Sequence, residues 1–167
     1  MSINLQPTLE GKLVTLRPLH PGDFPSLFAV ACDPLIWEQH PDSDRYREDV
    51  FRAYFQGALA SGGAFLVLDR RDGSVIGCTR FAHYKPEEDE VEIGWTFLAR
   101  SHWGGAYNGE MKQLMLRHVF QYVKRVVFVI GRNNLRSQRA VEKIGGVRAG
   151  TKLDAQGRES LVYHITA

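Results

Sequence analysis

The sequence has little of several features that would place it in a special class. Only two of its 167 residues are cysteines, Cys32 and Cys78, and they form no CxxC pair. This argues against a secreted disulfide framework and favours a reducing compartment. No apolar run approaches the roughly 18 residues that a membrane span needs. The first residues lack the cationic and apolar segments of a signal peptide. We therefore expect a cytoplasmic protein with no membrane partner.

An excess of charge of one sign is also missing. The chain has 21 Lys and Arg against 19 Asp and Glu, which gives a net charge of +2. Domains that bind nucleic acid usually have a pI above about 9 and a clustered basic face. The one concentration of arginines, between residues 132 and 148, is interleaved with helix-forming residues. We therefore expect no nucleic-acid partner, and an adaptor role would need strongly salt-dependent binding.

What is present is an average globular composition, with 44% hydrophobic residues, no repeat and no linker. The length suits one domain over residues 1–167, long enough to bury a core without a metal or disulfide staple. Hydrophobic periodicity predicts an α/β (α+β) chain. Strands are expected at 13–17, 64–70, 74–84, 91–99, 126–130, 147–153 and 161–166, and helices at 24–31, 43–60, 108–123 and from Asn134 to Gly145.

The connections between these segments predict a mixed sheet. Short turns make 64–99 an antiparallel meander and 147–166 a terminal hairpin. Residues 126–130 are a continuous apolar run, typical of a strand covered on both faces. Strand 91–99, helix 108–123 and strand 126–130 should then form a right-handed crossover.

The segment from Ser101 to Glu110 joins a strand to a helix and contains Gly104 and Gly105. Glycines let the backbone approach a ligand, and amides at a helix N-terminus favour an anion such as a pyrophosphate. The alternative is a merely flexible turn. The segment is neither GxGxxG nor a P-loop, which disfavours a dinucleotide fold and an NTPase.

A second polar cluster, residues 131–139, follows strand 126–130. Asn134 and Ser137 are three residues apart and share one face of a helix start. Either the cluster is a helix cap with a solvated basic face, or it meets a ligand at the same sheet edge as the glycine loop.

These residues resemble the GCN5-related N-acetyltransferase (GNAT) superfamily, and within it the ribosomal-protein alanine/serine acetyltransferase-like (RimJ/RimL-like) branch. The resemblance covers nearly the whole chain. It is strongest in WGGAYNGEMK (103–112) and in the stretch from Asn134 to Gly145, which contains Arg136. It implies a mixed, mostly antiparallel seven-stranded sheet splayed between strands four and five, with acetyl-CoA lying in the splay as cosubstrate.

The resemblance also implies roles for individual residues. Backbone amides of Gly104, Gly105, Ala106, Tyr107 and Asn108 would hold the pyrophosphate. Phe97, Leu98 and Ala99 would pair with the pantetheine arm, and Asn134 and Ser137 would contact the pantetheine and the sulfur region. The chain departs from the family at two positions. Ser101 stands where the family usually has Gln or Arg, and Val141 stands where many members have a Tyr that protonates the leaving thiolate. Ser137 is then the expected acid for the leaving thiolate.

Amide formation from a thioester needs a neutral amine, so a base is useful near neutral pH. Glu92 is the leading candidate, because the family often carries its base on this strand. Alternation places Val91, Ile93 and Trp95 on one face and Glu92 with Glu90 on the other. Glu90 is the second candidate, and a water-mediated route or an ordinary strand carboxylate are the alternatives. A backbone amide near Phe97 or Leu98 would polarise the carbonyl.

The expected activity is transfer of acetyl to a primary amine of a small molecule or a protein N-terminus. A non-catalytic acyl-CoA-binding or sensing module is the alternative. Helices 24–31 and 43–60 would wall the acceptor cleft, with Trp37, Tyr46 and Tyr84 as lining or simply as core residues. The six histidines form no HxxxH pair, so we expect no metal. A homodimer is possible.

Overall fold

The computed structural model describes residues 2–167 and contains an eight-stranded sheet in the order β1-β2-β3-β4-β5-β6-β8-β7. Only β5 and β6 pair in parallel among the strands described. The strands are β1 (Leu9–Glu10), β2 (Val14–Pro18), β3 (Ala64–Asp69), β4 (Val75–Lys85), β5 (Glu90–Leu98), β6 (Arg125–Gly131), β7 (Val147–Leu153) and β8 (Glu159–Thr166).

The helices are α1 (Phe24–Ala31), α2 (Glu48–Ser61), α3 (Ala106–Val119) and α4 (Leu135–Lys143). Four short 3-10 turns connect the elements: η1 (Pro21–Asp23), η2 (Pro34–Ile36), η3 (Pro86–Glu88) and η4 (Arg100–His102). The mixed, mostly antiparallel α/β architecture is as predicted, and the two-residue strand β1 is an addition to the seven expected strands. No helix between residues 2 and 167 is both long and apolar enough to cross a membrane.

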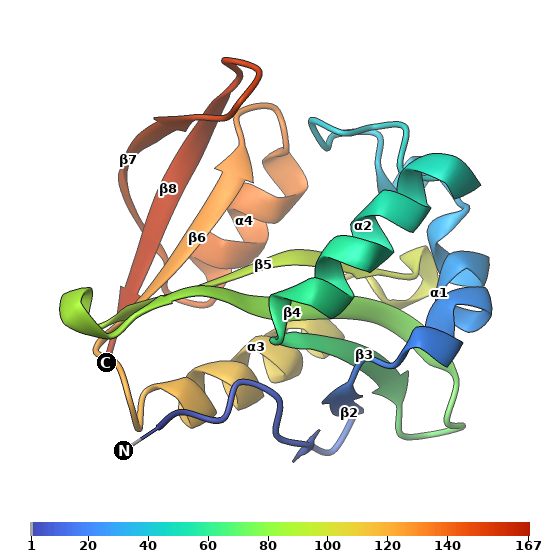
Figure 1. Cartoon of the computed structure of the whole chain (residues 1–167), viewed down its shortest axis with the longest axis horizontal. Coiled ribbons are helices and arrows are strands. Elements are labelled where there is room, and N and C mark those ends of the chain that lie inside the picture. The colour runs from blue at the N-terminus through green and yellow to red at the C-terminus, as the bar shows by residue number, and fades with distance from the viewer. Residues whose placement is uncertain (1) are drawn as a thin grey trace.

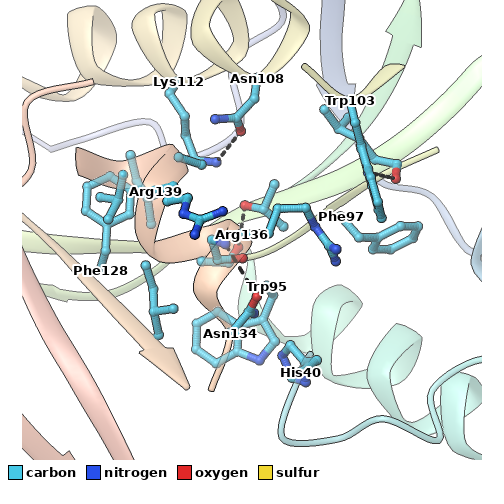
Figure 2. Close-up of a pocket in the computed structure, with 18 of the residues that line it drawn as sticks. His40, Trp95, Phe97, Trp103, Asn108, Lys112, Phe128, Asn134, Arg136 and Arg139 are labelled. Carbon is cyan, nitrogen blue, oxygen red and sulfur yellow. Dashed lines mark hydrogen bonds between the residues drawn. The ribbon is translucent and has the colours of Figure 1, made fainter. Parts of the chain in front are cut away.

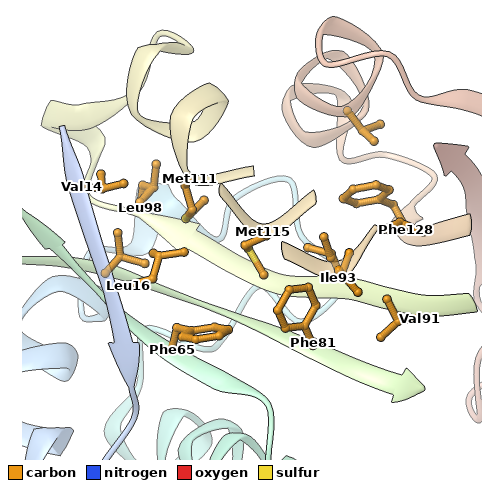
Figure 3. Packing of buried hydrophobic residues seen from close by; sticks show 14 of the residues in the cluster. Val14, Leu16, Phe65, Phe81, Val91, Ile93, Leu98, Met111, Met115 and Phe128 are labelled. Carbon is orange, nitrogen blue, oxygen red and sulfur yellow. The ribbon is translucent and has the colours of Figure 1, made fainter. Parts of the chain in front are cut away.

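Two hydrophobic clusters cover the two faces of the sheet. One packs α3 against the sheet, with Met111, Met115 and Val119 in the same cluster as Phe81 and Ile93. Figure 3 shows this packing around Met111 and Met115. The other packs α1 and α2 on the opposite face, through residues that include Leu27, Phe51 and Phe55. Figure 1 shows α3 on one side of β4 and β5 and α1 and α2 on the other.

The sheet opens between β5 and β6, as predicted. The two strands pair only where Glu90, Val91 and Glu92 face Arg125, Val126 and Val127. Beyond these three pairs β6 stays with β8, and β6, β8 and β7 turn away from β5 (Figure 1). The edge of β5 from Ile93 to Leu98 therefore has no neighbouring strand on the β6 side. The carbonyls of Trp95 and Leu98 accept hydrogen bonds from the Tyr54 hydroxyl and the Trp103 indole, and the other backbone groups on this edge can bind a ligand.

A bulge in β5 corrects the predicted alternation. Cys78 pairs with Phe97 and Arg80 pairs with Gly94, so two residues of β5, Trp95 and Thr96, stand opposite one of β4. Trp95 takes a positive φ of 51°. The bulge turns Trp95 to the α2 face, where it packs against the second cluster, while Ile93 stays in the first. Trp95 therefore lies on the same face as Glu92 and not with Ile93.

The boundaries of two helices also differ from the predictions. The expected helix 43–60 begins only at Glu48, because the carboxylate of Asp42 is engaged by Arg45 and Arg158 and caps no helix. The expected helix 108–123 begins at Ala106 after Gly105 and ends at Val119. Asn108 therefore lies inside α3. In contrast, Asn134 caps α4 as predicted.

Candidate active site

A cavity of about 510 Å³ lies at the splay between β5 and β6, bounded by the N-terminal ends of α3 and α4 and by residues around η2 (Figure 2). Most of the predicted cofactor residues line it, namely Phe97, Leu98, Gly104, Gly105, Asn108, Asn134 and Ser137. Ala99, Ala106, Tyr107 and Glu92 are not among its lining residues. The structure thus brings together two polar clusters that are separated by about 30 residues of sequence.

The glycine loop has the backbone geometry of an anion site. Gly104 and Gly105 have φ angles of 116° and 105°, a region that side-chain-bearing residues rarely adopt. A Cβ on Gly105 would lie 2.5 Å from Lys143 Nζ, so the flexible Lys143 side chain would have to shift to admit it. Gly105 directly precedes α3, whose first amides have no partner within the helix. The loop therefore fits a pyrophosphate through backbone amides and the helix dipole.

A buried carboxylate braces this loop from β3. Asp69 Oδ2 lies 2.9 Å from His102 Nε2 and accepts a hydrogen bond from the Tyr107 hydroxyl at 3.2 Å. The hydrogen bond with His102, followed by that of the Arg71 backbone amide, lowers the pKa of Asp69. His102 and Tyr107 flank the two glycines, so Asp69 holds the loop at both ends. The Tyr107 side chain thus points to Asp69, and the sequence gives no signal for this pairing.

The electrostatics of the cavity favour an anionic ligand. Within the described part of the chain, its lining includes five cationic residues and no Asp or Glu: Arg45, Lys112, Arg136, Arg139 and Lys143. Arg136 stacks on Trp103, with its guanidinium carbon 3.8 Å from the ring centroid, and donates to the carbonyl of Ile36 at 2.9 Å. Arg136 therefore links α4 to the other wall of the splay.

The start of α4 presents an amide and a hydroxyl to the cavity. Asn134 Oδ1 accepts from the Ser137 backbone amide at 3.4 Å, a long capping bond. The Asn134 side chain is 7% exposed, and its NH₂ group makes no hydrogen bond within residues 2–167. Capping therefore accounts for only part of the hydrogen-bonding capacity of this residue.

The two candidate bases have different partners. Glu92 is 9% exposed, and its Oε1 lies 2.8 Å from Nδ1 of His83, whose side chain is mostly exposed. His83 has a positive φ of 50° and packs edge-on against Trp95, which lines the cavity. Glu90 instead pairs with Arg125 at 2.6 Å. Glu92 is thus the better candidate, and His83 is a neighbour that sequence alternation did not reveal.

The predicted acceptor side is only partly as expected. Trp37 is buried and lines the cavity, next to His40 and Arg45. Burial, with Arg45 alongside, lowers the pKa of His40 to about 3, so this ring is neutral. Tyr46 is exposed and outside the cavity lining. Tyr84 packs against the α3-side cluster, because it lies on the opposite face of β4.

No group of three or more His, Cys, Asp or Glu side chains suited to hold a metal ion occurs in the part of the chain that the structure describes.

Comparison with protein families gives a match over residues 14–147 to the model described as "Acetyltransferase (GNAT) domain". No curated protein matches the chain in sequence. Among solved structures, a provisionally assigned acetyltransferase from T. thermophilus is 30% identical, with a TM-score of 0.76 over 95% of this chain and 88% of that one.

Two further structures share the fold at lower identity. A GCN5-related N-acetyltransferase from Brucella melitensis is 20% identical, with a TM-score of 0.84 over 96% of this chain and 79% of that one. RimJ from Mycobacterium smegmatis, solved in complex with CoA-disulfide, is 20% identical, with a TM-score of 0.77 over 100% of this chain and 90% of that one.

Proposed function

The chain belongs to the GNAT acetyltransferases and is an N-acetyltransferase that uses acetyl-CoA, and on that premise we propose that its acceptor is a primary amine of a small molecule or a protein N-terminus. Family membership favours an enzyme over the non-catalytic binding module. We further propose that residues 1–167 act as one cytoplasmic domain, with a homodimer as the assembly to test.

The observation that carries the cofactor assignment is the cavity itself. A left-handed glycine pair at the start of α3, five cationic side chains and the unpaired edge of β5 meet in one space. We propose that the amides of Gly104, Gly105, Ala106, Tyr107 and Asn108 bind the pyrophosphate. Phe97, Leu98 and Ala99 would pair with the pantetheine as a strand would, because the edge they share has no strand partner.

For the reaction we propose a direct attack. The amine nitrogen forms a bond to the thioester carbonyl carbon, and the carbon–sulfur bond breaks. Glu92 accepts the proton that the amine loses, and His83 on the same carboxylate offers this proton a route to solvent. Ser137 passes a proton to the leaving thiolate and takes one from solvent in the same step, so that its hydroxyl is restored. A backbone amide at Phe97 or Leu98 polarises the carbonyl, and positioning in the cavity supplies much of the remaining rate.

The test is release of free CoA from acetyl-CoA in the presence of a panel of small amines and of peptides with different N-terminal residues. Turnover with one class identifies the acceptor, and binding of acetyl-CoA with no turnover across both classes contradicts the proposed acceptor. Glu92→Gln should lower kcat by about 10²-fold or more, the range typical of general bases. The matched control is Glu87→Gln on the exposed turn η3, which should leave kcat unchanged.

A further inference from the structure

Lys112 is a buried cation that the mechanism above does not use. It lies on α3, is 7% exposed and lines the cavity. Its Nζ donates to Asn108 Oδ1 at 3.0 Å, and no carboxylate lies within ion-pair distance of it in residues 2–167 (Figure 2). An ammonium group that forms three hydrogen bonds in water is left here with one neutral partner.

Burial at this position is costly for the charged form. The neighbouring residues Met111 and Met115 belong to the apolar core. Burial lowers the pKa of Lys112 to about 7, so the side chain is near half protonation at neutral pH in the absence of a ligand. A methionine or leucine would fill the same volume without this cost. The lysine therefore has no stabilising role that its described contacts explain.

The direction of the side chain indicates what would offset the cost. Side chains on a helix point back towards its N-terminus. Lys112 follows this rule, because it reaches back four residues to Asn108 in the first turn of α3. Its amine thus lies beside the side chain of Asn108, whose backbone amide is one of those proposed to bind the pyrophosphate. An anionic oxygen there would favour the charged form, whereas a neutral carbonyl would compensate burial only weakly.

The other titratable and charged groups that face the cavity also favour an anionic ligand. Arg136, Arg139 and Lys143 line it from α4, His102 lines it from η4, and His40 and Arg45 line it from the segment before α2. These groups are cationic or neutral, so none of them offsets the charge of Lys112, and each favours an anion in the same space.

We propose that the Lys112 ammonium is a direct ligand of the coenzyme pyrophosphate, acting beside the backbone amides of the glycine loop. The inference rests on the proposed coenzyme site. Only the protonated form of Lys112 binds the pyrophosphate, so the protein takes up a proton when the coenzyme binds.

The experiment is calorimetric titration of dephospho-CoA, which keeps the pyrophosphate but lacks the 3′-phosphate that titrates near neutral pH. With a pKa of about 7, roughly 75% of free Lys112 is protonated at pH 6.5 and about 3% at pH 8.5. The Kd of the wild type should therefore rise about 25-fold over this interval. At pH 7.5 the heats in two buffers of different ionisation enthalpy should show uptake of about 0.75 proton.

Three variants make the assignment specific. Lys112→Met should weaken binding at pH 6.5 and remove both the pH dependence and the proton uptake. Lys112→Arg, which stays charged, should bind with a Kd that is flat from pH 6.5 to 8.5. Lys124→Met, at the exposed end of the crossover, is the matched control and should behave as the wild type. Without ligand, Lys112→Met should melt no lower than the wild type, whereas a structural lysine would lower Tm on removal.

The outcomes separate this inference from the proposed function. No binding of dephospho-CoA by the wild type at any pH contradicts the coenzyme site itself. Binding without proton uptake overturns the role of Lys112 even if Lys112→Met does not fold. Equal pH dependence in wild type and Lys112→Met assigns the uptake to another group and also overturns the role of Lys112.

Discussion

Asn134 allows helix capping and coenzyme binding to be separated by two substitutions at one position. Its Oδ1 caps α4 through a long 3.4 Å bond, while its NH₂ group has no partner in residues 2–167 and faces the cavity. Asn134→Ala should remove both contacts. Asn134→Ser should keep the cap, because a hydroxyl also accepts from the N3 amide, and remove only the NH₂ donor.

The geometry sets the expected magnitudes. A cap at 3.4 Å belongs at the weak end of the usual range, so its loss costs about 0.5–1 kcal/mol. This corresponds to about 1–4 °C in Tm for a chain of this length. One neutral hydrogen bond to a pantetheine carbonyl contributes about 1 kcal/mol, or roughly a fivefold change in Kd.

The assays are thermal unfolding without ligand and calorimetric titration with CoA. Asn134→Ala should lower Tm and raise Kd, while Asn134→Ser should keep Tm and still raise Kd about fivefold. If Asn134→Ser binds CoA as tightly as the wild type, Asn134 is only a helix cap, and the assignment of the α4 start to the pantetheine is wrong.

Three further predictions concern the same site. Asp69→Asn should lower Tm and weaken CoA binding roughly tenfold, because it loosens the loop at His102 and Tyr107. The exposed control Asp72→Asn should change neither quantity. A lower Tm with unchanged CoA binding would show that Asp69 stabilises the fold but does not contribute to the coenzyme site. Gly105→Ala should weaken CoA binding at least tenfold, whereas Gly73→Ala, at a φ of 75° in an open turn, should carry a similar backbone strain of about 1 kcal/mol with unchanged binding. Because burial lowers the pKa of Lys112 to about 7 and an unfolded lysine titrates near 10.4, the unfolded chain binds more protons between these values. The free energy of unfolding of the wild type should therefore rise relative to that of Lys112→Met as pH increases from 7 towards 10, by up to about 1.4 kcal/mol per pH unit in denaturant titrations. A constant difference would contradict the burial of a titrating lysine.

The sequence predicted the strands and their meander because each strand carries its own periodic or continuous apolar pattern, whereas the splay was implied by the resemblance to the GNAT superfamily. It misplaced Trp95 because a bulge breaks strict alternation, and nothing in a single strand marks where two of its residues will face one neighbour. It set the start of the second helix too early because Asp42 and Asp44 are good caps in isolation, whereas Arg158, from the far end of the chain, engages Asp42 in the fold.

The candidate site was predicted where the chemistry is local. The glycine loop and the Asn134 cap lie within short motifs, and the structure joins them in one cavity. The residues missed, Asp69, His83 and Lys112, act through contacts across the sheet or through burial. Of these, only Lys112 had a possible signal: it is four residues from Asn108 and three from Met115, on the inward face of the helix.

The most direct test of the account is a crystal structure with acetyl-CoA. We expect the pyrophosphate oxygens to accept hydrogen bonds from backbone amides between Gly104 and Asn108, and the pantetheine to lie along the unpaired edge of β5 at the splay. Coenzyme bound outside this cavity, or held in it without the loop amides, would contradict the central claim.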